Sequence, residues 1–373
     1  IFNIKFTEIA GVMIPSAILF ILLKKKNTNR FTPLYKYFRY YRILVIINVF
    51  WMLLFYSFDF SSIILSIKYF IPLYLFFYFN EMIKNDTDFI GTLQTYYYSY
   101  FFIFIFFVME LIFGSQFIRE TRGFVRSTAG FYDATNLSMS TIFALIIMTF
   151  TYFYMKKNKI KTRLTKTPYF LSSLFLFIFI TYSTFQISSY VVLFCILILF
   201  SFFIFKIDKK LILYLSPLIP LMLSPISKMF NTFLIMANKD LLVLAGERSA
   251  STALHGRVNL WTDVYNQVTD MNLFQKLLGL NHSIYSSQTA HNDFIRVFMM
   301  IGLLGLLIYL LIFLKSLYFS YKASFAFKYL GLAVVFTTGL YSISSTPSFF
   351  TFSSIPIFCV ISYLSTRHKI RYK

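Results

Sequence analysis

The side chains with the clearest chemical potential are six arginines in or just after two hydrophilic segments, residues 115–135 and 231–292. A guanidinium group is always charged and binds a phosphate through two parallel hydrogen bonds, whereas a lysine acts as a point charge. Such a set suits the diphosphate of a lipid headgroup. The plainer alternative is that each arginine is solvated or paired with a neighbouring carboxylate. The six are Arg119, Arg122, Arg126, Arg248, Arg257 and Arg296.

A second group of polar residues, His291-Asn292-Asp293, lies directly ahead of a long apolar run. Asn and Asp are good N-cap residues, so we expect a helix to begin at Asn292 or Asp293 and to present its positive dipole end there. A neutral histidine at that place can act as a general base near neutral pH. The alternative for His291 is an interfacial residue with no chemical role. Arg296 follows within two turns and would anchor a headgroup or support its neighbours.

We expect no metal and no other cofactor. No pair of His, Cys or carboxylate residues has metal-ligand spacing, and the chain has no glycine-rich phosphate loop. His255 and His282 have no partner pattern, and His368 lies in the basic tail. The two cysteines, Cys195 and Cys359, lie inside apolar runs, where they are expected to be small packing residues.

The elements that must position these residues are membrane helices. The chain has 373 residues, of which 58% are hydrophobic and 13% charged, and its mean hydropathy is +0.69. Continuous apolar runs of about 20 residues predict an all-α, polytopic integral membrane protein with 11 or 12 spans, and they argue against a β-barrel. The expected spans are 4–23, 42–58, 60–79, 95–114, 136–155, 169–187, 188–205, 211–230, 293–314, 328–346 and 349–366.

The charges predict the orientation of the chain. The net charge is +21, and it gathers in short connections such as 24–42 and 156–168 and in the tail that begins at Arg367. With eleven spans these connections fall on one side, which the positive-inside rule places in the cytoplasm. The same placement argues against nucleic-acid binding.

Two segments are expected on the outer side of one transmembrane domain, 1–373. They are a first periplasmic loop, 115–135, and a large periplasmic loop, 231–292, with one or two short helices lying over the outer face. Residues 256–267 carry Val258, Trp261, Val264 and Tyr265 at helical spacing. Because the chain begins at Ile1, we expect natural residues ahead of it.

Three stretches together resemble the superfamily of O-antigen ligases and Wzy-type O-antigen polymerases. They are RSTAGFYDATNLSMS at 126–140, GRVNLW at 256–261 and HNDFIRVFMMIGLLGLL at 291–307. The shared pattern is an R-x-x-G-x-F-type stretch with a following Asn, here Asn136, then an outer loop bearing Arg, then His-Asn ahead of a glycine-containing helix. The resemblance covers roughly residues 115–310 in order and spacing.

The resemblance implies a metal-independent, inverting membrane glycosyltransferase with a GT-C-like architecture. It would take a glycan from undecaprenyl diphosphate at the periplasmic face of the bacterial inner membrane. It also implies that Arg126, Arg257 and His291 are the catalytic positions. The partners would be the lipid-linked glycan donor and acceptor, the bilayer, and a chain-length regulator of the same pathway.

The role of each residue is an expectation. Catalysis needs positive charge where the diphosphate leaves, a base at the acceptor hydroxyl, and a groove that aligns two glycans. Arg126 and Arg257 would hold the diphosphate, and His291 would act on the hydroxyl. The residues expected to bind substrate are Arg122, Asn136, Arg248, Trp261, Asn292 and Arg296.

One departure favours a polymerase over a ligase. The ligases have an Arg in a Ser/Thr-rich segment that opens a later span, and the corresponding stretch here, TYSTFQISSYVVL at 181–193, has Gln186 and no Arg. The ligase stays an alternative. A flippase or other transporter of lipid-linked oligosaccharide is a rival from another class, although it would be expected to bury charges in a central cavity. A structural or assembly protein of the membrane is a third possibility.

Overall fold

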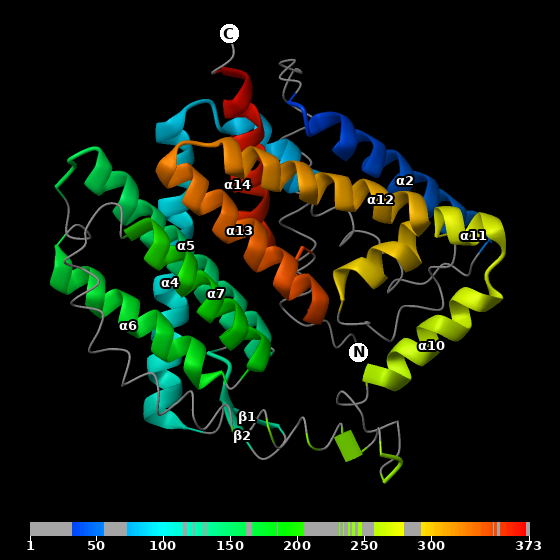
Figure 1. Ribbon diagram of the computed structural model, residues 1–373, viewed down its shortest axis with the longest axis horizontal. Coiled ribbons are helices and arrows are strands. Elements are labelled where there is room, and N and C mark those ends of the chain that lie inside the picture. The colour runs from blue at the N-terminus through cyan, green and yellow to red at the C-terminus, as the bar shows by residue number, and fades with distance from the viewer. Residues whose placement is uncertain are drawn as a thin grey trace, which may run out of the picture.

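A computed structural model describes residues 32–55, 73–114, 118–121, 124–129, 131, 133–161, 166–184, 186–204, 257–279, 292–345, 347–348 and 351–370, with a few more between 231 and 247. Its elements are α2 (Tyr35–Phe55), α4 (Asp86–Phe113), β1 (Ile118–Thr121), β2 (Phe124–Ser127), α5 (Ala134–Lys157), α6 (Thr167–Ser183), α7 (Ile187–Ile204), α10 (Arg257–Asp270), α11 (Leu273–Leu278), α12 (Asp293–Lys322), α13 (Phe325–Ser344) and α14 (Thr351–Ile370). Residues 73–82 are also helical. Figure 1 shows α4, α5, α6, α7, α13 and α14 packed together, with α10 apart from them.

Four of the described helices, α4, α5, α12 and α13, are long and apolar enough to cross a membrane, by length and composition. Each overlaps a predicted span, although α4 begins well before the predicted 95–114, and helices also occupy the spans predicted near α2, α6, α7 and α14. The helical class of membrane protein expected from the sequence is therefore confirmed. The predicted spans 4–23 and 211–230, and most of 60–79, lie outside the described residues.

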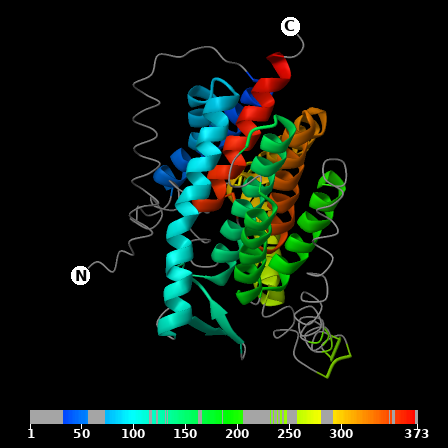
Figure 2. The same ribbon diagram turned by 90° about the vertical axis from the view of Figure 1, so that its left-hand side faces the viewer.

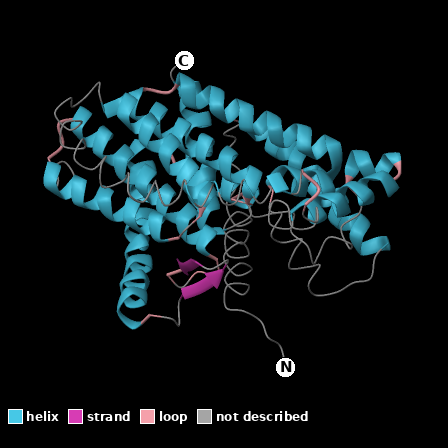
Figure 3. Ribbon diagram, turned by 60° about the horizontal axis from the view of Figure 1, so that its bottom comes forward, coloured by secondary structure: helices cyan, strands magenta, loops and turns pink. Residues whose placement is uncertain are grey.

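The segment predicted as the first outer loop, 115–135, contains a β-hairpin that the sequence analysis did not predict. Strands β1 and β2 pair antiparallel, and Arg119 lies opposite Arg126 in the register. The hairpin lies beside the last turns of α4, as Figures 2 and 3 show, and β2 contacts α5 and α6. The large segment 231–292 contains the two short helices α10 and α11.

Helix α5 is the centre of the bundle. Nearly all residues in the apolar part of α5 are buried, because five helices pack against it: α4, α6, α7, α13 and α14. Its hydroxyl groups bond to neighbouring helices: Thr141 lies 2.5 Å from the Tyr100 hydroxyl, and Thr149 lies 2.7 Å from the Tyr329 hydroxyl. Such bonds satisfy polar atoms that neither lipid nor core could satisfy.

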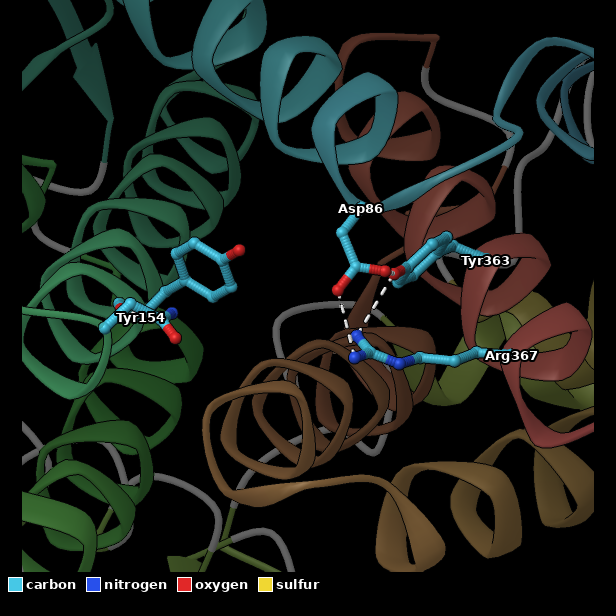
Figure 4. Close-up of polar contacts among 5 residues, drawn as sticks. Asp86, Tyr154, Tyr363 and Arg367 are labelled. Carbon is cyan, nitrogen blue, oxygen red and sulfur yellow. Dashed lines mark hydrogen bonds and ion pairs between the residues drawn. The ribbon is translucent and has the colours of Figure 1, made fainter. Parts of the chain in front are cut away.

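Basic side chains mark one end of the bundle, which we call the basic end. Arg367, near the end of α14, forms an ion pair of 3.0 Å with Asp86, at the start of α4. The Tyr363 hydroxyl donates to the same carboxylate and lies 3.1 Å from the Arg367 guanidinium, and Figure 4 shows the three side chains converging. Other members of this end are Lys156 and Lys157 of α5, Lys322 of α12 and Lys328 of α13.

Helix α12 differs from the prediction of a continuous span at 293–314. It extends to Lys322, and non-helical dihedral angles at Ile301 and Gly302 divide it into two segments. Gly302 has φ +70°, a conformation that residues with a Cβ rarely adopt. The segments form a bend that Figure 1 shows to the right of α13. Helix α11 lies against the bend, and its C-cap Gly279 also has a positive φ, +75°.

The break is held by close backbone packing and by one side chain. A Cβ on Gly302 would overlap the Leu277 carbonyl, and a Cβ on Gly279 would overlap the backbone of Gly302. The buried side-chain amide of Asn48, on α2, donates to the Met300 carbonyl at the break and to the Leu278 carbonyl, the latter at 3.3 Å. These carbonyls have lost their helical partners, and Asn48 satisfies both.

Replacing Gly302 with Ala should therefore destabilise the protein. Gly302 combines φ +70° with ψ −171°, a conformation that costs a residue with a Cβ about 1–3 kcal/mol, and the overlap with Leu277 adds to this cost. The expected result is a lower thermal midpoint of the detergent-purified protein, measured by fluorescence-detected size exclusion after heating. Gly91→Ala is the control, because a Cβ there meets nothing within 4 Å and Ala favours a helix. Equal midpoints for the two variants would contradict this account of the break.

Candidate functional site

The centre of the candidate site is Asp293, whose carboxylate is completely buried at the first residue of α12. Its Oδ2 atom accepts hydrogen bonds from the Ser342 hydroxyl at 3.1 Å, the Ser348 backbone N–H at 3.3 Å and the Tyr309 hydroxyl at 3.4 Å. Its Oδ1 atom has no hydrogen-bond partner among the described residues. A buried carboxylate with one free oxygen can accept a proton or a further donor.

The break in α12 makes these contacts possible. Tyr309 lies in the second segment, yet its hydroxyl reaches Asp293 in the first, and its ring meets Phe294 edge-on with 6.0 Å between centroids. The same hydroxyl lies 2.8 Å from the Ser348 hydroxyl. The site thus combines both segments of α12 with the end of α13 and the turn that follows it.

Asn292 caps α12, as predicted. Its Oδ1 accepts from the Ile295 N–H at 3.0 Å, and its Nδ2 donates to the Ile343 carbonyl at 3.1 Å. The cap therefore also ties the start of α12 to the end of α13. Arg296 lies one turn further on and is half-buried, so its positive charge lies close to that of the helix N-terminus.

A hydroxyl network lies next to this site. The Ser189 hydroxyl, at the start of α7, donates to the Ser138 hydroxyl of α5 at 2.5 Å, and Ser138 lies 3.4 Å from the Tyr341 hydroxyl of α13. Tyr341 precedes Ser342, which binds Asp293. We call this part of the bundle, opposite the basic end, the carboxylate end.

A second buried carboxylate, Glu110 of α4, fixes the chain that follows Arg126. Its two oxygens accept from the backbone N–H groups of Thr128, at 3.2 Å, and Ala129, at 2.8 Å. Ala129 has a positive φ of 44°, so the two bonds hold an unfavourable backbone conformation. Phe131, just beyond, contacts Phe352 of α14 with 6.0 Å between ring centroids.

The structure places only some of the predicted site residues. Arg126 is half-buried on β2, and Asn136 is half-buried in the first turn of α5. Arg257 begins α10 and Trp261 lies in its first turns, but their side chains are outside the described residues, as are Arg122, Arg248 and His291 entirely. The structure brings together Asn292 and Arg296, with Asp293 between them. The described residues contain no group of three His, Cys, Asp or Glu that could hold a metal.

Comparisons with family models, with curated proteins and with solved structures return no significant match to this chain. The resemblance to the ligase and polymerase superfamily therefore stays a prediction from the three sequence stretches.

Three residues that organise this region are not among the site residues predicted from the sequence. The sequence predicts Asp293 only as a helix cap, and it predicts no role for Glu110 or Asn48. Their residue types could have marked these positions, because Asp, Glu and Asn are costly within apolar segments and usually have a specific partner there. Their partners lie far away along the chain and could not be predicted.

Removing the Asp293 carboxylate should destabilise the carboxylate end. In Asp293→Ala the Ser342 hydroxyl, the Ser348 N–H and the Tyr309 hydroxyl lose an acceptor, and an unsatisfied buried donor costs about 1–3 kcal/mol. A lower thermal midpoint in detergent is expected, with Asp293→Asn between the Ala variant and the wild type because it keeps one acceptor oxygen. Asp263→Ala, on the exposed face of α10, is the control. If both Ala variants have the same thermal midpoint as the wild type, the Asp293 carboxylate does not stabilise the carboxylate end.

Proposed function

We propose that this chain polymerises oligosaccharide repeat units carried on undecaprenyl diphosphate into O-antigen or capsular polysaccharide, at the periplasmic face of the bacterial inner membrane. The observation that carries the proposal is the start of α12. His291 directly precedes Asn292, which caps that helix, and Asp293 ties it to α13. A helix start leaves backbone N–H groups free and favours an anion.

The reaction needs no metal. The acceptor sugar hydroxyl gives its proton to His291 and attacks the anomeric carbon of the donor. A new C–O bond forms as the bond from that carbon to the diphosphate oxygen breaks, and the configuration inverts. Undecaprenyl diphosphate leaves with both electrons of the broken bond, and Arg126 and Arg257, assisted by Arg122 or Arg248, stabilise its charge.

The described residues around α12 support this chemistry as positioning groups. Asn292 and Asp293 fix the helix start on which the direction of His291 depends. Arg296 adds positive charge one turn inside the helix. Asn136 and Trp261 complete the proposed binding surface for the glycans, and the bilayer holds both lipid tails. A chain-length regulator of the same pathway is the proposed protein partner.

The orientation follows from the positive-inside rule. Lysines and arginines mark the basic end, so we place that end in the cytoplasm and the carboxylate end, with β1 and β2, in the periplasm. A ligase that transfers glycan to the lipid A core stays an alternative. The sequence departure at Gln186 disfavours it, because a ligase is expected to carry an Arg in that segment.

A transporter is the second candidate, and one observation favours it. Broken helices with free carbonyls and buried carboxylates line the ion and substrate sites of many secondary transporters, and α12 has both a break at Gly302 and a buried Asp293. However, Asn48 occupies the Met300 carbonyl at the break. A carbonyl bonded in this way has one lone pair fewer for an ion.

The polymerase proposal predicts a specific defect in variants of the two catalytic residues. A deletion strain complemented with His291→Ala or Arg257→Ala, at matched expression, should attach a single repeat unit to its lipopolysaccharide core, because transfer of one unit needs no polymerisation. Electrophoresis of the lipopolysaccharide reads this directly. His368→Ala, in the basic tail, is the control and should keep the full ladder.

The same gel separates the alternatives. A lost ligase leaves the core without glycan while polymer accumulates on the lipid carrier. A lost transporter leaves the core bare with no polymer at all. Full ladders from the His291 and Arg257 variants would refute the proposed catalytic assignment.

A further inference from the structure

A cleft of about 410 Å³ opens at the basic end, between the start of α2 and the second segment of α12. Lys36 and Arg39 of α2 and Lys315 of α12 line it, together with tyrosines that include Tyr35 and Tyr40. It lies away from Asp293, and the proposed polymerase reaction does not use it.

The electrostatics of this cleft suit an anion. Its lining contains three cationic side chains and no carboxylate, and no acidic residue lies in the first turn of α2. The three cations have no ion-pair partner among the described residues. Lys36 instead lies over the Tyr37 ring at 5.0 Å, and Lys315 lies over the Tyr318 ring at 5.8 Å. The positive end of the α2 dipole points to the same place.

A buried hydroxyl adds a second, independent sign of a ligand. Thr32 lines the cleft and is 5% exposed. Its Oγ1 atom is buried and has no hydrogen-bond partner among the described residues. A buried hydroxyl without a partner is costly, and rotation of the Thr32 side chain toward the cleft would let a phosphate oxygen accept its proton.

Apolar stripes lead away from the cleft along both helices. On α2, Lys36 and Tyr40 continue at helical spacing into Ile43, Ile47 and Phe50, which are 42%, 42% and 63% exposed. On α12, Lys315 continues into Leu311 and Leu307, which are 41% and 48% exposed. The two helices pack against each other, and Figure 1 shows them running side by side. Basic residues followed by an exposed apolar stripe match a lipid headgroup followed by its acyl chains.

We infer that this cleft binds the phosphate headgroup of an anionic membrane phospholipid, whose acyl chains lie along the stripes of α2 and α12. Lys36, Arg39 and Lys315 bind the phosphate, and Thr32 donates to it. The lipid holds α2 to α12 at the basic end, while Asn48 holds the same two helices together at the break. Bound lipid therefore stabilises the α2–α12 pair, which is independent of any glycosyl transfer.

The test uses the full-length protein purified in neutral detergent and titrated with mixed micelles of phosphatidylglycerol or phosphatidylcholine. The wild type should gain thermal stability with phosphatidylglycerol and little with phosphatidylcholine. The triple variant Lys36→Gln, Arg39→Gln, Lys315→Gln should need at least about tenfold more phosphatidylglycerol for the same gain, because each lost charge weakens attraction to an anionic headgroup. The matched control is Lys157→Gln, Lys161→Gln, Lys166→Gln, which removes the same charge from exposed positions outside the cleft.

The outcomes are decisive in either direction. A tenfold loss in the cleft variant alone supports the site. Equal losses in both triple variants would show a general charge effect and overturn it, as would equal gains from the two lipids. Inorganic phosphate serves as the third arm. If millimolar phosphate alone matched the gain from phosphatidylglycerol, the cleft would be a site for free anions and the lipid assignment would be wrong.

Discussion

Two hydrogen bonds from the side chain of Asn48 hold the arrangement of α2, α11 and α12. A helix that is interrupted inside apolar surroundings exposes carbonyls that no water can satisfy, and each such group costs several kcal/mol. Asn48 satisfies the Met300 carbonyl at the break and the Leu278 carbonyl at the end of α11. The two glycines, Gly279 and Gly302, allow the backbones to come close enough for one amide to reach both.

The candidate site is a consequence of that break. In a straight helix Asp293 and Tyr309 would be about 24 Å apart along the axis. Because α12 bends at Gly302, the Tyr309 hydroxyl lies 3.4 Å from the Asp293 carboxylate. The first segment of α12 then lies beside the end of α13, where Ser342 and the turn at Ser348 complete the shell around Asp293. A polar site can therefore form at the start of an apolar helix.

Local features of this region could be predicted from sequence, whereas its long-range features could not. Asn292 was expected to cap a helix because cap chemistry depends only on neighbouring residues. The burial of Asp293 depends on Ser342 and Ser348, which lie far along the chain. The run from Ile301 to Leu306 fits an uninterrupted apolar helix equally well, since glycines are common in membrane helices. Only the approach of α11 and the amide of Asn48 explain why the helix breaks there.

The carboxylate end behaves as one packed unit, and this bears on the proposed chemistry. Glu110 fixes the chain directly after β2, and Phe131 carries that chain onto Phe352 of α14. The turn before α14 holds Ser348, which donates to Asp293. A continuous path of contacts thus joins β2, which carries Arg126, to the start of α12, which directly follows His291. Their relative position depends on buried packing, which suits a reaction that gains most of its rate from alignment and fixed charge.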